Sequence, residues 1–332
     1  MPAAVTPSPD PKRVFVLGAT GTIGQATVAA LLARGHHVTC FLRPRAPGDT
    51  HLPLPDAARL RFGDVTDPAA LIRDGFQGDR FDALVSCMAS RSGTPHDAWA
   101  IDHKAHVAAL APARDAGIAH VILLSAICVQ KPRLAFQQAK LAAEQALIAS
   151  GLTYSIVRPT AFFKSLSGQV ARLRAGKPFL LFGDGALTAC KPISDADLGR
   201  YIASCLDDPD RQNRILPIGG PGPAITPYQQ GQMLFRLLGQ EPRFRHVPLR
   251  MMDVIIAGLG ALGRLSPTWR DKAELARIGR YYATESMLLL DPVTGRYDAD
   301  ATPEFGTDTL EAFYTRLIRG EVSVDLGDHA VF

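Results

Sequence analysis

The stretch RVFVLGATGTIG spans residues 13–24 and decides the expected fold. Its first part, Arg13–Leu17, is a short apolar run rich in β-branched residues, which predicts a buried strand. After the glycine-rich turn, Thr22–Arg34 has helical periodicity and stops at Gly35, a helix-stop signal. A strand, a glycine-rich turn and a helix in this order are typical of the start of a dinucleotide-binding βαβ unit.

The glycine-rich turn also has the chemistry that a pyrophosphate needs. Gly18 and Gly21 let the backbone turn tightly and approach phosphates without a Cβ in the way, and Gly24 lets the helix pack close to the sheet. The free N–H groups and the positive end of the helix dipole then face the phosphates. We therefore expect a cofactor site here, the alternative being a turn with a purely structural role. The expected contacts are Gly18, Thr20, Gly21, Thr22, Ile23 and Gly24.

Strands and helices continue to alternate from this point outward. Further strands are expected at His37–Leu42, Leu60–Gly63, Phe81–Cys87, His120–Ser125 and Tyr154–Arg158, and further helices at Asp97–Ala116 and Leu134–Ser150. Strands separated by helices imply right-handed crossovers and a parallel sheet that is covered on both faces. The expected fold is therefore α/β, a Rossmann-type doubly wound parallel sheet.

After Pro159 the regularity fades. A strand or hairpin with a Gly183-Asp184-Gly185 turn is expected within Leu180–Lys191. The other expected elements are a strand at Arg214–Ile218 and helices at Ser194–Leu206, Pro227–Leu238, Arg250–Leu265 and Thr268–Tyr282. We expect a disordered tail over residues 1–11, a dinucleotide-binding domain over 12–160, and a smaller, mostly helical substrate-binding region over 161–332, partly interleaved with the sheet.

The composition bounds the class of protein. A 332-residue chain with 47% hydrophobic and 20% charged residues is typical of a soluble globular protein, and a net charge of +4 is too mild to argue for nucleic acid. The five cysteines form no C-x-x-C pair, so we expect reduced thiols and no metal site. Residues 1–10 lack the features of a signal peptide, and no apolar run is long enough to span a membrane. We expect a cytoplasmic protein.

The end of the second expected strand indicates which cofactor binds. An NAD site usually has a carboxylate there for the ribose 2′-hydroxyl, but no Asp or Glu occurs between Gly21 and Gly48. Arg43 follows the strand instead and can pair with a 2′-phosphate, with Arg45 as a possible second contact. The sequence therefore favours NADPH, the alternative being that Arg43 is a solvated surface residue.

Asp64 and Val65 follow the third expected strand. The carboxylate of Asp64 can accept a hydrogen bond from the adenine amino group. An aspartate in a turn or at a helix cap is the alternative, although Asp67 is the better cap candidate. We expect Asp64 and Val65 to contact the cofactor.

Several motifs at strand ends together resemble the extended and atypical short-chain dehydrogenase/reductases. They are the glycine-rich turn, Gly63-Asp64-Val65, Ser86-Cys87-Met88-Ala89, Leu124-Ser125 and Arg158-Pro159-Thr160. The resemblance extends to about Leu238 and implies that NADP(H) lies across the carboxyl ends of the strands, with Ser86 and Pro159 among its contacts. It also implies catalysis by a serine, here Ser125, and by a Tyr-x-x-x-Lys pair.

The chain departs from that pattern at the tyrosine. The family position reads Phe136-Gln137-Gln138-Ala139-Lys140, so Lys140 is present and implies a contact with the nicotinamide ribose, but the acid is missing. A phenyl ring cannot protonate a carbonyl oxygen, which makes carbonyl reduction doubtful. Reduction of a conjugated C=C bond needs no such acid, because charge spreads through the conjugated system and a proton can come from water. The alternative is an accidental Phe-x-x-x-Lys pair.

Four longer stretches look like the NADPH-dependent divinyl chlorophyllide a 8-vinyl reductase family. They are Cys128–Pro132, Phe136–Lys140, Arg158–Leu166 and Tyr281–Met287. The resemblance implies reduction of the 8-vinyl group of 3,8-divinyl (proto)chlorophyllide a, a tetrapyrrole, to an ethyl group in (bacterio)chlorophyll synthesis. Two other classes remain open. One is a non-catalytic NADPH-binding regulator or assembly factor, and the other is a reductase of another conjugated ring, like the isoflavone-reductase branch.

A large flat substrate needs apolar contacts and a proton donor. Phe136, Phe162, Phe163 and Tyr282 are the candidate substrate contacts, although core packing explains Phe162 and Phe163 equally well. Ser125 and Tyr282 are weak candidates for the proton donor. The apolar residues 250–265 have three interpretations, namely a packed helix, a lid over the macrocycle, or a patch for peripheral contact with a photosynthetic membrane.

Overall fold

The computed structural model describes residues 10–44 and 52–324, and these form two compact units. The described residues up to Ser90, together with Pro95–Pro159 and Asp195–Pro217, make the first unit. Arg91–Thr94, Thr160–Ser194 and the described residues from Ile218 onward make the second. Most of the expected N-terminal tail, and Arg45, lie outside the described residues.

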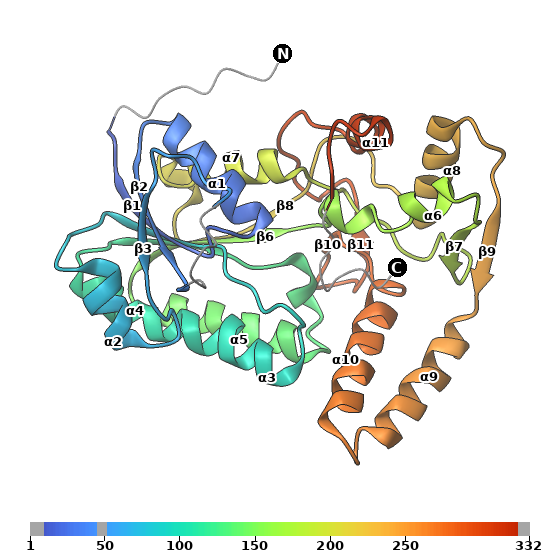
Figure 1. Ribbon diagram of the computed structural model, residues 1–332, viewed down its shortest axis with the longest axis horizontal. Helices are drawn as coiled ribbons and strands as arrows, with labels where there is room; N and C mark the ends of the chain where they lie inside the picture. Colours follow the sequence, from blue (N-terminus) through green and yellow to red (C-terminus); the bar gives the residue numbers. More distant parts are fainter. Residues whose placement is uncertain (1–9, 45–51, 325–332) are drawn as a thin grey trace. The chain divides into compact units, whose positions relative to one another are not determined.

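The first unit is built on a seven-stranded sheet in the order β3-β2-β1-β4-β5-β6-β8 (Figure 1). The strands are β1 Arg13–Leu17, β2 His37–Leu42, β3 Arg59–Phe62, β4 Ala83–Ser86, β5 His120–Leu124, β6 Thr153–Pro159 and β8 Arg214–Ile218. All neighbours from β3 to β6 pair in parallel. The chain reverses its direction of winding between β1 and β4, as in a doubly wound fold, so the predicted fold class is confirmed.

Helices cover both faces of this sheet (Figure 1). Helix α1 (Thr22–Ala33) packs with α7 (Asp195–Ser204) on one face. The other face carries α2 Pro68–Ala70, the π-helix η1 Leu71–Phe76, α3 Pro95–Ala98, the π-helix η2 Trp99–Ala105, α4 His106–Asp115 and α5 Ala135–Ala149. Two 3₁₀ turns, η3 Ile127–Gln130 and η5 Pro209–Arg211, complete the unit. The long helix expected at Asp97–Ala116 is thus interrupted by a π-helical stretch.

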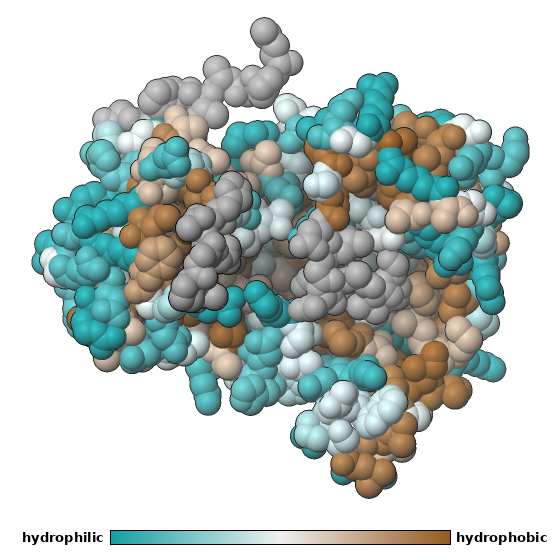
Figure 2. Space-filling view, viewed as in Figure 1, coloured by the Kyte–Doolittle hydropathy of each residue, from teal (hydrophilic) through white to brown (hydrophobic). Residues whose placement is uncertain are grey.

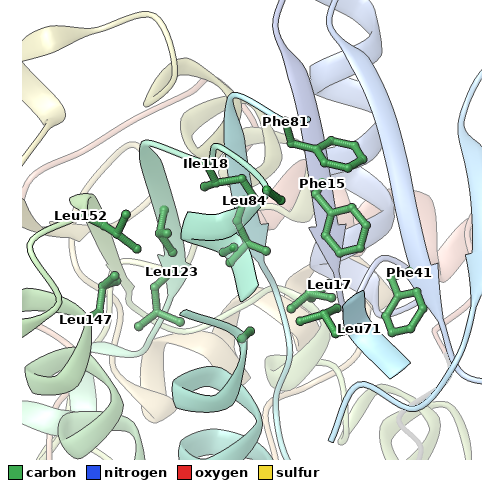
Figure 3. Packing of buried hydrophobic residues seen from close by; sticks show 14 of the residues in the cluster. Phe15, Leu17, Phe41, Leu71, Phe81, Leu84, Ile118, Leu123, Leu147 and Leu152 are labelled. Carbon is green, nitrogen blue, oxygen red and sulfur yellow. The ribbon is translucent and has the colours of Figure 1, made fainter. Parts of the chain in front are cut away.

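The core of the first unit explains why β1 reads as an apolar run. Phe15 and Leu17 point into a cluster with Phe41, Leu71 and Leu84 on one face of the sheet (Figure 3). Val14 and Val16, which alternate with these residues along β1, are fully buried on the opposite face. Burial of each such side chain stabilises the folded protein by about 1.5–3 kcal/mol, because the side chain is removed from water. This burial stabilises the strand that leads into the glycine-rich turn.

A buried histidine on β5 makes this unit sensitive to acid. His120 is 7% exposed, and its Nε2 lies 2.9 Å from the hydroxyl of Ser155, which itself donates to the carbonyl oxygen of Arg211. Burial, with a smaller effect from Lys12, lowers the pKa of His120 from 6.5 to about 4. The ring is therefore neutral in the folded protein at neutral pH.

We predict that this histidine makes the folded state less stable in acid. Between pH 6.5 and about 4 the unfolded chain binds a proton at His120 that the folded chain does not, so stability falls as pH falls. The free energy of unfolding should decrease by as much as about 3 kcal/mol from this group. Urea unfolding at pH 7 and at pH 4.5 measures this change. Between these two pH values the free energy of unfolding should fall less in the His120→Phe variant than in wild type. Equal losses in both proteins would refute the prediction.

The second unit has its own small core. It is enclosed by three helices and two strands, namely α6 Val170–Arg174, α8 Pro227–Leu238, α11 Leu310–Arg319, β7 Phe179–Phe182 and β9 Phe244–Val247. The same unit contains the turn η4 Lys164–Leu166 and the strands β10 Leu289–Leu290 and β11 Tyr297–Asp298. The sequence predicted a strand or a hairpin within Leu180–Lys191, and the structure confirms the strand as β7, whereas the hairpin is wrong. Strand β7 pairs in parallel with β9, far along the chain, and a short apolar run does not reveal its partner.

Helices α9 (Leu249–Leu262) and α10 (Pro267–Tyr282) form a helical hairpin in this unit (Figure 1). Of the α9 side chains only Met252 is buried. Helix α9 packs along one side against α10, so the packed-helix interpretation of residues 250–265 holds for that side, while several apolar side chains on its other side stay exposed. The sequence shows how apolar the helix is but not which of its faces are covered.

Candidate cofactor and active site

The carboxyl edge of the sheet collects the residues predicted to bind the cofactor. The strands β1 to β6 are parallel, so their carboxyl ends meet at one edge. The residues at or just after these ends are Gly18, Arg43, Asp64, Ser86, Ser125 and Pro159. Ligands of doubly wound sheets bind in the crevice at this edge, next to the point where the winding reverses.

The glycine-rich turn is shaped by close backbone packing. Gly18 has a φ of +75°, and a Cβ there would lie 2.6 Å from the backbone of Cys87 and Met88. A Cβ at Gly24 would lie 2.1 Å from the carbonyl oxygen of Gly18. At Gly21 the nearest atom would be 3.5 Å away, so the space beside this residue is open. Close backbone packing therefore requires glycine at residues 18 and 24, whereas the space beside Gly21 is open to a ligand.

The first turn of α1 suits an anion. Gly21 is the N-cap and has no side chain to satisfy the first N–H groups, and the first turn carries no acidic residue. The positive end of the helix dipole therefore meets no negative side chain of its own helix. This arrangement fits a pyrophosphate, as the sequence predicted.

Arg43 and Asp64 lie at neighbouring strand ends. Arg43 is exposed, directly after β2. Asp64 accepts hydrogen bonds from the hydroxyl and the N–H of Thr66, which hold its pKa below the usual value, and the charge of Arg43 acts in the same direction. Val65 is half-buried against the core, and Asp67 caps α2, as expected. Asp64 is thus built into a turn, yet it stays exposed enough to meet a ligand.

Ser86, at the end of β4, has a buried hydroxyl without a hydrogen-bond partner among the described residues. Nε2 of His106 on α4 is likewise buried and unpartnered within the described part of the chain. Both residues line a cavity of about 10 Å³, which is roughly the space of one water molecule. Buried polar groups are normally satisfied, and the cavity is large enough for one water molecule beside these two residues.

Lys140 is fixed by a buried ion pair that the sequence did not suggest. Its Nζ lies 2.8 Å from Oδ1 of Asp102, a residue on η2 that is 1% exposed. The same oxygen accepts from the N–H of Ser90 at 3.2 Å. Phe136, one turn before Lys140 on α5, is buried and carries no polar group. Lys140 is therefore a positioned cation, with a phenyl ring at the place where the short-chain dehydrogenase/reductase pattern has a tyrosine.

A second buried network fixes Ser125. Its hydroxyl donates to Oε1 of Glu144 on α5, and Arg158 on β6 binds both carboxylate oxygens of Glu144. Glu144 is 1% exposed, and Ser125 is 5% exposed. The hydroxyl proton of Ser125 is directed at Glu144 in this geometry, and the role of Ser125 as proton donor stays a prediction. No local sequence pattern joins Ser125, Glu144 and Arg158, because the three residues lie far apart in the chain.

The other predicted substrate contacts belong to the second unit. Phe163 is 2% exposed and packs on Phe313 with ring centroids 5.4 Å apart, so its role as a substrate contact is wrong and core packing explains it. Phe162 is half-buried beside Ile193. Tyr282 is 41% exposed. Phe162 and Tyr282 thus retain surface that could meet a substrate.

Comparison with known proteins identifies the family. Residues 18–209 match the model of the NAD(P)H-binding family. The chloroplastic divinyl chlorophyllide a 8-vinyl-reductase of Zea mays is 51% identical, over 96% of this chain and 82% of the maize protein. The chain belongs to the divinyl chlorophyllide a 8-vinyl-reductase family. Its Arabidopsis thaliana member is 46% identical, over 97% of this chain and 80% of that protein.

The family assignment confirms several predictions. The suspected divinyl chlorophyllide a 8-vinyl-reductase resemblance, the oxidoreductase class and an NAD(P)H cofactor all agree with it. Among solved structures, the NADPH-dependent quinone oxidoreductase QOR2 of Escherichia coli, bound to NADPH, has a TM-score of 0.64. It is 18% identical and covers 92% of this chain and 99% of its own, which shows a shared fold. Within the described ranges no helix is both long and apolar enough to cross a membrane.

Proposed function

We propose that this chain uses NADPH to reduce the 8-vinyl group of 3,8-divinyl (proto)chlorophyllide a to an ethyl group, in chlorophyll or bacteriochlorophyll synthesis. The observation that carries the proposal is the pairing of Phe136 with a positioned Lys140. A site with a fixed cation and no acid at that position suits reduction of a conjugated C=C bond better than reduction of a carbonyl. Family membership supports the choice of substrate.

The first unit holds the cofactor in this proposal. The turn residues Gly18, Thr20, Gly21, Thr22, Ile23 and Gly24 bind the pyrophosphate, and Arg43, Asp64, Val65, Ser86 and Pro159 complete the site. When bound, the reduced nicotinamide supplies the hydride. The open space at Gly21 and the uncapped start of α1 support the phosphate position.

Lys140 orients the nicotinamide ribose. An ammonium group has three donors, and Asp102 uses one of them, so two remain for ribose hydroxyls. Asp102 and Glu144 act as positioning residues. Asp102 holds the ammonium group, and Glu144 ties α5 to Ser125 and Arg158 at the ends of β5 and β6. Correct placement of the reacting carbon is the main contribution of such a site, because orientation alone can supply several kcal/mol.

The substrate is a flat tetrapyrrole with an apolar macrocycle. We propose Phe136, Phe162 and Tyr282 as its contacts, with water or Tyr282 as the proton source. The conjugated ring carries the charge that develops after hydride addition, so the protein needs no oxyanion acid. We also propose that the protein works in the cytoplasm against a photosynthetic membrane, where such an amphiphilic pigment accumulates.

We predict that Arg43→Asp selectively weakens NADPH binding. The change removes a charge-assisted pair with the 2′-phosphate and adds a repelling charge, so NADPH affinity should fall by more than about tenfold, which is about 1.4 kcal/mol. NADH affinity should change far less, and fluorescence titration of both cofactors measures this. Arg319→Asp is the matched control, because Arg319 is 69% exposed on α11. Equal affinity of wild type for NADH and NADPH would disprove the assignment.

Substrate-dependent oxidation of NADPH tests the proposed function. Purified protein should oxidise NADPH when divinyl chlorophyllide is added and should not do so with the 8-ethyl product, which is the matched control. A protein that binds NADPH but oxidises none with the divinyl pigment would instead be a regulator or assembly factor. Oxidation with other conjugated rings alone would assign it to a different reductase class.

A further inference from the structure

The hairpin of α9 and α10 exposes an unusual amount of apolar surface. Val254 is 72% exposed, Ile255 47% and Leu262 42%, all on one side of α9. Leu265, in the turn between the helices, is 84% exposed. The segment 254–263 contains no charged residue. Figure 2 shows this hydrophobic surface over the end of the hairpin. Isolated exposed apolar residues are normal, but a contiguous patch marks an interaction site.

The charges next to this patch are mostly basic. Arg264, Arg270 and Lys272 surround the hairpin turn, with Asp271 as the single acid between residues 264 and 272. Trp269 is 38% exposed, and the ammonium group of Lys272 lies 4.6 Å from the centre of its ring. A helix that lies in a membrane interface has an apolar face, an aromatic residue with one polar edge, and basic residues beside the apolar face. Here the basic residues are Arg264, Arg270 and Lys272, which we call the basic collar.

We propose that the α9–α10 hairpin docks on the surface of an anionic lipid bilayer, with Val254, Leu262 and Leu265 in the acyl boundary and the basic collar on the headgroups. This deepens the proposed membrane location by naming the surface that makes the contact, and it rests on that location. The positive charge of the basic collar favours an anionic partner. A lid over one pigment molecule would use at most one cation, for the propionate, whereas a layer of anionic headgroups can pair with all three cations around the 84% exposed Leu265.

Flotation with lipid vesicles tests the proposal. The full-length protein should bind vesicles of phosphatidylglycerol and phosphatidylcholine, bind pure phosphatidylcholine more weakly, and lose binding as salt increases. The double variant Val254→Glu/Leu265→Glu should bind the anionic vesicles at least about tenfold more weakly. The matched control is Ile72→Glu/Val293→Glu, at two residues that are 52% and 91% exposed elsewhere. It should bind like wild type.

Activity measurements separate this proposal from the proposed reaction. With substrate dissolved in buffer and no vesicles, the hairpin variant should turn over at the wild-type rate. Vesicle binding needs no activity, so it can succeed or fail whatever the reaction is. The proposal is overturned if the wild-type protein does not bind anionic vesicles, or if the Val254→Glu/Leu265→Glu variant binds them as tightly as wild type does. A loss of activity on dissolved substrate would indicate a lid, and a wild-type dimer that the variant dissociates would indicate a contact between two copies.

Discussion

Replacement of Lys140 by alanine is expected to lower the rate of vinyl reduction by at least about a hundredfold, or about 2.7 kcal/mol of transition-state stabilisation. The variant loses the cation that Asp102 holds 2.8 Å away and that we propose orients the nicotinamide ribose. A small displacement of the reacting groups costs a large fraction of the rate. The measurement is single-turnover reduction of divinyl chlorophyllide at saturating NADPH.

Lys140 pairs with the buried Asp102, so this experiment needs a control for stability. Lys140→Ala leaves the carboxylate of Asp102 buried without its cation, which can cost several kcal/mol of stability. The double variant Lys140→Ala/Asp102→Asn removes that charge, so it should fold better than the single variant and remain equally inactive. Phe136→Tyr should not activate the enzyme. Near-normal turnover without Lys140, or strong activation by Phe136→Tyr, would show that the site works differently.

Replacement of Gly21 by valine is expected to weaken NADPH binding strongly while the protein still folds. The backbone at Gly21 is extended, with φ −71° and ψ 160°, which valine adopts readily. The nearest atom to the new Cβ is 3.5 Å away, so the free protein accommodates it. The side chain would then occupy the space where we place the pyrophosphate. A loss of at least about a hundredfold in affinity is expected by titration.

Gly24→Val is the contrasting variant. Its Cβ would lie 2.1 Å from the carbonyl oxygen of Gly18, so this change should damage the fold itself. Circular dichroism and thermal melting distinguish the two effects, with Gly21→Val close to wild type and Gly24→Val strongly destabilised. A folded Gly21→Val protein with normal affinity for NADPH would mean that the pyrophosphate does not bind at this turn.

The first half of the fold follows from local patterns. The strand at Arg13–Leu17 and the strand at His37–Leu42 have the predicted bounds, and helix α5 differs from its predicted range by one residue at each end. Parallel strands buried on both faces read as continuous apolar runs, and glycines mark the ends of their helices. Parallel order then follows from the crossovers, which is why the carboxyl edge could be assigned in advance.

The failures have physical causes. Strand β7 finds its partner β9 more than sixty residues later, and no local pattern encodes a distant parallel pairing. The π-helix at Trp99–Ala105 differs from an α-helix by only a small change in winding, which 3.6-residue periodicity does not detect, yet it carries Asp102. The sequence also could not separate buried from exposed aromatics, so it left substrate contact and core packing equally open for Phe163, which lies in the core.

The most direct test of the account is the absorption spectrum of one reaction mixture. Purified protein, NADPH and divinyl chlorophyllide a should give a blue shift of the Soret band and a product two hydrogen atoms heavier than the substrate. The shift should require NADPH and should be absent with the folded Lys140→Ala/Asp102→Asn variant. If folded wild-type protein that binds NADPH leaves the Soret band unchanged, the central claim that this chain reduces the 8-vinyl group is contradicted.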